Sequence, residues 1–399
     1  DSVVAGVNKN TDQIMAMMRG ELGTKVELTI VRRGEPKPIK KEIIRGSIPV
    51  KSVDVAYMLN DTTGYVKINT FGMHTYAEFM RSLVDLKQLG MRKVIIDLRE
   101  NEGGVLETAI KMINEFLDAD KLILYTQGKA RARMDFTSNG QGRYKDIRVD
   151  VLISEFSASA SEIFAGAIQD NDRGLIIGRR SFGKGLVQRQ FPLTDGSMVR
   201  LTVSHYFTPS GRCIQKPYKG KDYQAEVYER YTSGEMFSAD SIELTDSTKY
   251  YTKKDHRLVY GGGGIIPDVF VPVDTGINYT YFNRLLAKGV INEYVLNYVD
   301  KNRESLKKKY PKFEAFKKDF QVTDAMVDEI VKIGEKQGVK KDEKLFVPIV
   351  PEIKLFVKSL IARDLWNMNE LYRISNEQNK VLKAGIKALQ DGTYGKIIK

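Results

Sequence analysis

The sequence predicts an α/β core that follows a small mixed segment and precedes a helical region. Between about residue 50 and residue 272, apolar strand-like runs alternate with amphipathic helix-like stretches, which is the order of an α/β protein. Four glycines at 261–264 and Pro267 mark a boundary near the end of this region. From about residue 275 onward the pattern is helical. These three observations define the predicted architecture.

The N-terminal segment begins with an expected helix over residues 11–19, which places apolar residues at helical spacing. Every second residue from Val26 to Ile30 is apolar, a pattern typical of a half-buried strand. Further extended chain follows to about residue 46. A segment of this size is too small to fold alone.

The core region contains expected strands and helices in alternation. The run Lys93–Leu98 is almost wholly apolar, which favours a strand that is buried on both faces. The expected strands span 65–71, 93–98, 149–153, 175–177 and 198–207. The expected helices span 75–89, 110–117 and 163–168. No strand or helix is assigned to the polar, tyrosine-rich residues 215–262.

The C-terminal region is expected to end in one long amphipathic stretch over residues 352–390. Apolar residues recur there at helical spacing, among them Leu355, Leu360, Trp366 and Leu371. No internal repeat is present.

The composition excludes several classes of protein. The chain has 399 residues, of which 42% are hydrophobic, so we expect two or three globular domains. It has one cysteine, Cys213, which excludes an internal disulfide and a cysteine-rich zinc site. The net charge of +12 is spread among acidic residues, so we expect no nucleic-acid partner. No run of 18 apolar residues occurs. The chain begins at Asp1 without a signal peptide, and we expect it to be a fragment of a longer protein.

The stretch Ser157-Ala-Ser-Ala-Ser-Glu162 lies between a buried strand and an apolar helix. Ser159 and Glu162 fit the S-x-x-E capping box, which would make them a helix start and nothing more. The same place in the fold would also expose a nucleophile, because helix N-terminal amides can stabilise an oxyanion. Both interpretations are open from these residues alone.

The stretch from Gly178 to Gly185 nearly matches the phosphate-binding loop G-x-x-x-x-G-K-[ST]. Gly185 stands where the magnesium-binding hydroxyl should be, and a strand rather than a helix is expected after Lys184. An NTPase is therefore disfavoured. None of the three histidines, at 74, 205 and 256, has a catalytic context. A serine protease without a histidine base needs another base, and a neutral lysine is the known alternative.

These motifs resemble those of the C-terminal processing peptidases, also called tail-specific proteases. The similarity covers about residues 50–272 and rests on motifs in a fixed order. They are Asp97-Leu-Arg-Glu-Asn-Glu-Gly-Gly104, Ser157–Glu162, Ala167-Ile-Gln-Asp170, Gly183-Lys-Gly185, Val187-Gln188, Thr208-Pro-Ser-Gly-Arg212 and Gly264-Ile-Ile-Pro-Asp268. Each motif is weak alone, but together they are specific.

The resemblance implies a role for each matching position. Ser159 corresponds to the nucleophile and Lys184 to the general base, while Gln188 corresponds to the residue that orients the lysine. The oxyanion hole would use the amide of Ala160 and one amide from Gly103 or Gly104. Asp170 matches an acidic position that supports the site.

The resemblance also implies three domains. Residues 1–46 look like the second half of a PDZ domain, with residues 22–32 as its closing strand. The first strands and the carboxylate-binding loop of such a domain would lie upstream of Asp1. Residues 47–272 would form a protease core of crotonase-like fold, and residues 273–399 a helical extension.

The function that follows is an endopeptidase that cuts proteins near their C-termini, in the bacterial periplasm or cell envelope. Its partners would be proteins or peptides with accessible C-termini, and a homo-oligomer is compatible with the family. No metal or organic cofactor is implied. Two alternatives are open: a non-catalytic ligand-binding module of the same fold, and an acyl-CoA enzyme of the crotonase-like fold.

Overall fold

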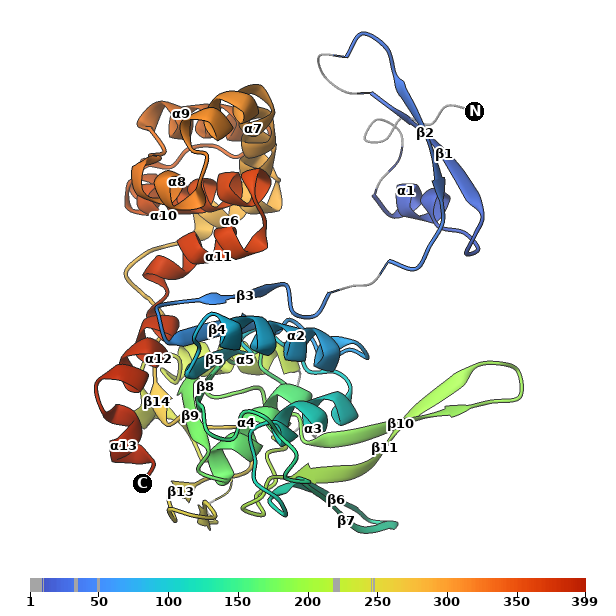
Figure 1. Ribbon diagram of the computed structural model, residues 1–399, viewed down its shortest axis with the longest axis vertical. Helices are drawn as coiled ribbons and strands as arrows, with labels where there is room; N and C mark the ends of the chain where they lie inside the picture. The colour runs from blue at the N-terminus through green and yellow to red at the C-terminus, as the bar shows by residue number, and fades with distance from the viewer. Residues whose placement is uncertain are drawn as a thin grey trace. The chain divides into compact units, whose positions relative to one another are not determined.

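The computed structural model describes residues 9, 11–31, 35–48, 51–217, 223–244, 246 and 248–399. They form two compact units, Asp1–Lys51 and Ser52–Lys399 (Figure 1). The first unit contains helix α1 (Thr11–Met18) and strands β1 (Lys25–Ile30) and β2 (Ile39–Ile44). The two strands pair antiparallel, with Lys25 opposite Ile44. The expected helix and strand are confirmed, whereas residue 32 lies outside the described residues.

A six-stranded sheet forms the centre of the second unit, in the order β14-β9-β8-β5-β4-β3. The edge strand β3 is antiparallel to β4, and all other neighbours are parallel. The strands are β3 (Val55–Met58), β4 (Thr63–Lys67), β5 (Lys93–Asp97), β8 (Arg148–Ile153), β9 (Gly174–Gly178) and β14 (Val269–Phe270). The apolar runs of the sequence thus form the expected buried strands.

Both faces of this sheet are covered, because successive side chains point to opposite faces. Val94 and Ile96 pack with helices α2 (Thr75–Gln88), α3 (Leu106–Asn114) and α4 (Ala160–Asp170) on one face. Ile95 packs on the other face with helix α12 (Lys380–Gln390). The last helix, α13 (Thr393–Ile397), covers the same face (Figure 1). The end of the chain therefore completes the core.

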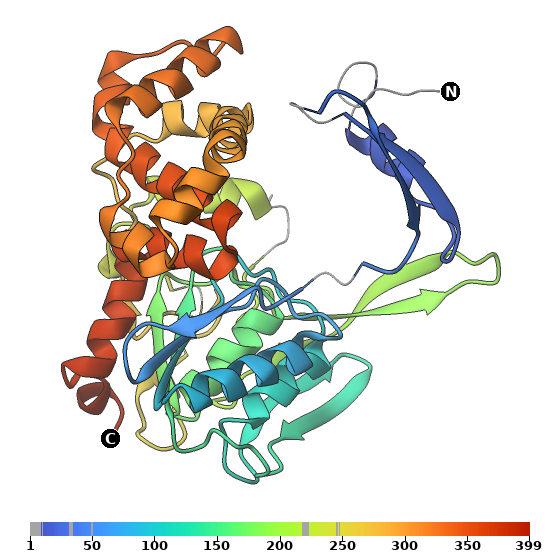
Figure 2. The ribbon, with the colours of Figure 1, turned by 45° about the horizontal axis from the view of Figure 1, so that its top comes forward.

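A second, four-stranded sheet lies beside the central one, in the order β10-β11-β6-β7. Strands β10 (Leu186–Pro192) and β11 (Met198–Phe207) match the expected strands. They extend beyond the sheet as a two-stranded ribbon (Figure 2). Strands β6 (Leu122–Gly128) and β7 (Arg131–Thr137) were not expected from the sequence. The short pair β12 (Tyr250–Tyr251) and β13 (Leu258–Val259) completes the described strands.

Helices dominate the chain after residue 279, as expected. Helices α6 to α11 have an apolar cluster of their own. They are α6 (Thr280–Ala287), α7 (Val290–Lys309), α8 (Phe313–Asp319), α9 (Asp324–Lys336), α10 (Glu343–Leu365) and α11 (Met368–Ser375). No helix in the described part of the chain is both long and apolar enough to cross a lipid bilayer. The predicted domain division at residue 272 stays a prediction.

The expectation of one long stretch over residues 352–390 is wrong, because three helices share it. Asn367 and Asn379 each start a new helix, and their side chains accept hydrogen bonds from the amides of Asn369 and Leu382. Asparagine is a preferred N-cap residue. The apolar residues on either side of these two asparagines keep helical spacing, so the sequence pattern does not reveal where one helix ends and the next begins. Helix α5 (Tyr223–Thr232) and a 3-10 turn at Ala239–Ser241 lie in the polar region that had no assignment.

Candidate active site

A cavity of about 930 Å³ brings together most of the residues that the motifs single out. Its lining includes Gly103, Gly104, Ser159, Lys184 and Gln188. These residues come from the turn after β5, the start of α4, the loop after β9 and strand β10. Segments up to 85 positions apart, from 103 to 188, therefore meet at one place.

Ser159 is the one serine of its motif that lines the cavity. Its backbone has a positive φ of 55° and a ψ of −114°, which is rare for a residue with a side chain. The Ser157 hydroxyl is buried and donates to the carbonyl of Leu98 at 2.8 Å. The Ser161 hydroxyl is buried and donates to the carbonyl of Asn101 at 2.8 Å. The two outer serines thus fix the turn, and the middle serine faces the cavity.

Glu162 connects the serine turn with the lysine loop. Its Oε2 atom accepts from the amides of Ser159 at 2.9 Å and Lys184 at 2.8 Å. Its Oε1 atom accepts from the Ser181 hydroxyl and the Gly183 amide, both at 2.6 Å. Burial raises the pKa of the Glu162 carboxyl, although these four hydrogen bonds act to lower it. The expected capping box is present, but the same carboxylate also holds the second motif.

Tyr206 on β11 connects the same two segments from the other side. Its hydroxyl lies 2.6 Å from the carbonyl oxygen of Lys184 and 3.2 Å from that of Ser159. Burial raises the pKa of Tyr206 well above its ordinary value, so the hydroxyl keeps its proton and stays a donor. Two buried side chains therefore fix the backbones of Ser159 and Lys184 relative to each other.

The two glycines after β5 differ in what their amides do. The Gly103 amide donates to Asn101 Oδ1 at 2.9 Å. Within the described part of the chain, the amides of Gly104 and Ala160 have no hydrogen-bond acceptor. Gly103 has a φ of 98°, and a Cβ atom there would lie 2.8 Å from the Ala160 nitrogen. The glycine turn and the start of α4 are thus in direct contact, which only a residue without a side chain allows.

The remaining predicted residues have different positions. Gln188 lines the cavity directly after a bulge in β10, opposite Thr202. Asp170 does not line it; its Oδ1 atom pairs with Arg212 at 2.7 Å, and both side chains are fully buried. Its Oδ2 atom accepts from the amide of Ser210 at 3.0 Å. Asp170 therefore joins the end of α4 to the Thr208–Arg212 motif.

The three histidines lie outside the set of described residues that line the cavity. His74 and His256 are exposed, and His205 is half-buried on β11 opposite Leu186 and Gln127. Among the described residues, no three His, Cys, Asp or Glu side chains come together as a metal site.

Comparison with known proteins finds similarity to a family of peptidases. Residues 62–225 match the model of peptidase family S41. A probable CtpA-like serine protease of Staphylococcus haemolyticus is 36% identical over 249 residues, which cover 61% of this chain and 49% of the relative. These matches support the C-terminal processing peptidase family for the matched part of this chain.

Other similar proteins carry related descriptions. A probable CtpA-like serine protease of Staphylococcus epidermidis is 38% identical over 222 residues, which cover 55% of this chain and 44% of the relative. The solved structure of a photosystem II D1 C-terminal processing protease covers 63% of this chain and 57% of its own, with 25% identity and a TM-score of 0.40. Residues 281–367 match a family of unknown function, DUF8443. The chain spans about half the length of the curated relatives that it matches.

Part of the site was not predicted from the sequence. Glu162 was noticed only as half of a capping box, and Tyr206 only as part of a strand. The capping box could have indicated a buried carboxylate beside the serine, but nothing in the sequence shows that Gly183 and Lys184 also reach it. Those contacts depend on how two loops meet in space.

Proposed function

We propose that this chain is a serine endopeptidase in which Ser159 is the nucleophile and Lys184 is the general base. One observation carries the proposal: a single carboxylate oxygen, Glu162 Oε2, accepts from the backbone amides of both residues. Both residues also line the same cavity. Fixed mutual geometry of nucleophile and base is what nucleophilic catalysis requires.

In this proposal Ser159 Oγ attacks the scissile carbonyl while Lys184 Nζ takes the hydroxyl proton. The resulting ammonium then gives that proton to the leaving amine, and water hydrolyses the acyl-enzyme by the reverse sequence. Gln188 orients the lysine without adding charge. We assign the oxyanion hole to the amides of Ala160 and Gly104, because the amide of Gly103 is already bonded to Asn101.

We further propose that residues 47–272 form a crotonase-like protease core and that residues 1–46 form the second half of a PDZ domain. The helix and antiparallel strand pair of the N-terminal unit are consistent with such a half. The substrates would be proteins cut near their C-termini. We also propose a location in the bacterial periplasm or cell envelope, which fractionation of the native host would test.

The proposed function is tested with a folded reporter protein that carries different C-terminal tails. We expect cleavage near the tail, detected as defined fragments by mass spectrometry. Binding of the tail without cleavage would instead favour a ligand-binding module. Hydrolysis of an acyl-CoA thioester without peptide cleavage would favour an acyl-CoA enzyme.

The N-terminal unit gives a prediction about tail recognition. A PDZ domain captures a C-terminal carboxylate in a backbone nest, which the half-domain proposed for residues 1–46 would not include. The chain of residues 1–399 should therefore cleave a peptide with a free C-terminus and its amide at similar kcat/KM. A longer chain that includes such a nest should prefer the free acid. A strong preference for the free acid in residues 1–399 would place recognition outside this unit.

Replacement of Glu162 should lower turnover. In Glu162→Gln, the amide nitrogen would face at least one backbone N–H whichever way the side chain is turned, and each orphaned buried donor costs about 1–3 kcal/mol. We expect a lower melting temperature and a fall in kcat that exceeds the change in KM. Glu115→Gln is the matched control, because buried Glu115 accepts from the Tyr76 hydroxyl and the Arg143 amide, neither of which lines the cavity. Equal kcat in both variants would exclude the linking role.

The glycine turn should be similarly sensitive. A Cβ atom at Gly104 would lie 2.2 Å from the carbonyl oxygen of Phe71, so Gly104→Ala must shift the amide that faces the oxyanion. Loss of one oxyanion donor typically costs about 10²–10³ in kcat. Gly140→Ala is the control. Gly140 also has a positive φ, of 70°, and a Cβ atom there would lie 2.7 Å from the Cβ of Ala119, but Gly140 does not line the cavity. Unchanged kcat in folded Gly104→Ala and Gly103→Ala would place the oxyanion hole elsewhere.

A further inference from the structure

The loop that carries Lys184 has no helix or strand, yet the amides of residues 181–185 are all hydrogen-bonded. The Ser181 amide donates to Ile265 at 3.0 Å and the Phe182 amide to Ser157 at 3.0 Å. The Gly183 and Lys184 amides donate to Glu162, and the Gly185 amide donates to Gln215 Oε1 at 2.8 Å. Because buried peptide groups are costly when unpaired, these partners define one conformation of the loop.

The carbonyls at the start of this loop share one donor, the guanidinium of Arg230. Its Nη1 atom lies 2.9 Å from the carbonyl oxygen of Ser181 and 3.4 Å from that of Arg180. Its Nη2 atom lies 3.1 Å from the carbonyl oxygen of Phe182. Arg230 is on α5 and is only 3% exposed. One side chain thus holds three consecutive carbonyls of the loop.

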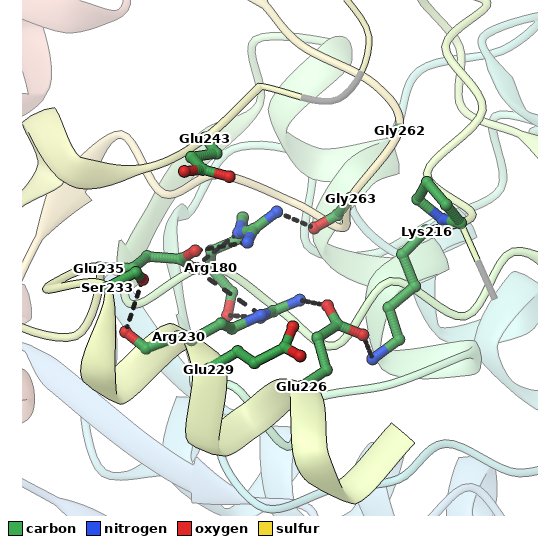
Figure 3. Close-up of a pocket in the computed structure, with 11 residues that line it drawn as sticks. Arg180, Lys216, Glu226, Glu229, Arg230, Ser233, Glu235, Glu243, Gly262 and Gly263 are labelled. Carbon is green, nitrogen blue, oxygen red and sulfur yellow. Dashed lines mark hydrogen bonds and ion pairs between the residues drawn. The ribbon is translucent and has the colours of Figure 1, made fainter. Parts of the chain in front are cut away.

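Carboxylates hold Arg230 in turn. Glu226, one helical turn earlier, accepts from Arg230 Nη2 at 3.2 Å and lies 2.6 Å from Lys216 Nζ. Glu235 lies 3.9 Å from Arg230 Nε and pairs with Arg180 through both of its oxygens. Figure 3 shows these charged side chains converging around a pocket of about 140 Å³ behind the loop. The guanidinium is therefore both buried and fixed in direction.

We infer that Arg230 is a positioning residue for Lys184, an inference that rests on the proposed function. The donors of a guanidinium are spread over a planar fork, so its two terminal nitrogens can hold three carbonyls at once, whereas the three donors of a lysine all lie on one nitrogen. Small displacements of a catalytic group are expensive, since a shift of about 1 Å can cost on the order of 10²-fold in rate. Arg230, Glu226 and Glu235 all follow residue 225, where the match to peptidase family S41 ends.

The test is Arg230→Ala with chemical rescue. We expect kcat to fall on the order of 10²-fold while KM changes little, because the cavity that holds the substrate is intact. Added guanidinium at millimolar concentration should restore much of kcat by occupying the vacated position. Sodium and methylammonium chloride at equal ionic strength should not. Arg230→Lys keeps the charge and most of the volume. It should also lose kcat, because the single nitrogen of lysine cannot occupy the positions of both Nη1 and Nη2.

Arg173→Ala is the matched control. Arg173 also donates to several backbone carbonyls, at 2.8 Å to Phe116 and 3.0 Å to Tyr144, but it has no described contact with residues 180–185. This variant should lose stability, keep kcat and show no rescue. Wild-type kcat in a folded Arg230→Ala or Arg230→Lys protein would overturn the inference. So would a loss of kcat in Arg230→Ala that guanidinium does not restore.

Lys184→Met separates this inference from the proposed function. If Lys184→Met is inactive and Arg230→Ala behaves as wild type, only the positioning role is wrong. If Lys184→Met keeps wild-type kcat, the proposed function itself is wrong.

Discussion

Ser159→Ala is expected to abolish peptide cleavage while the protein stays folded. Removal of the nucleophile from a serine protease costs on the order of 10⁶ in kcat. The replacement removes at most a helix cap, which is worth about 0.5–2 kcal/mol, so the melting curve should change little. Turnover of a peptide substrate and thermal unfolding of the same preparation measure the two effects separately.

The neighbouring serines provide the contrast. Ser157→Ala and Ser161→Ala each remove one hydrogen bond from a buried carbonyl that keeps a backbone amide donor, at a cost of about 0.5–1.5 kcal/mol, and they keep the nucleophile. Ser157→Ala also leaves the Ser154 amide without its acceptor, which adds about 1–3 kcal/mol. Both variants should be less stable than wild type and still cleave. Full activity of a folded Ser159→Ala protein would remove Ser159 as the nucleophile.

Lys184→Arg is expected to be inactive. A guanidinium stays protonated at any working pH, so it cannot take the serine proton. Gln188→Glu should lower kcat, since a carboxylate beside the amine favours the charged form, which cannot act as a base. Peptide-cleavage kinetics of the folded variants measure both effects.

Several other titratable groups lie near the lysine. Glu162 from α4 and Tyr206 from β11 hold its backbone. The cavity also contains Glu102, Glu107, Arg131, Arg189 and Arg200. Histidine contributions are tested by replacing His74, His205 and His256 in turn. A histidine variant that loses all turnover while folded, together with an active Lys184→Arg protein, would contradict the Ser-Lys mechanism.

Local patterns predicted the central sheet well, because its strands are buried on both faces. The strand at Lys93–Asp97 packs against apolar side chains on both faces of the sheet, so its residues form a continuous apolar run. Such a run is visible in the sequence even when the neighbouring strands are not known. Strands β6 and β7 were missed: in β7 most residues are exposed, and Arg131, Arg133 and Asp135 interrupt its apolar pattern. The breaks within residues 352–390 were missed because Asn367 and Asn379 interrupt the chain without changing its apolar period.

The candidate site was predicted as separate motifs, and the cavity contains residues of most of them. The resemblance supplied their roles, whereas the contacts between them required the structure. Glu162 accepts hydrogen bonds from residues that lie 19 or more positions later in the sequence. Arg230 donates hydrogen bonds to a loop that lies about 50 positions earlier. Contacts at such separations leave no periodic signal. For the same reason, the sequence did not indicate that the amide of Gly103 is hydrogen-bonded to Asn101 while the amide of Gly104 has no described acceptor.

The most direct test of the Ser-Lys assignment is to locate the acyl group on the enzyme. Wild type and Lys184→Met are mixed with a peptide ester, quenched in acid, digested and analysed by mass spectrometry. The account predicts an acyl adduct on Ser159 in the wild type and none in Lys184→Met. An adduct on another residue, or equal acylation of Ser159 in both proteins, would contradict it.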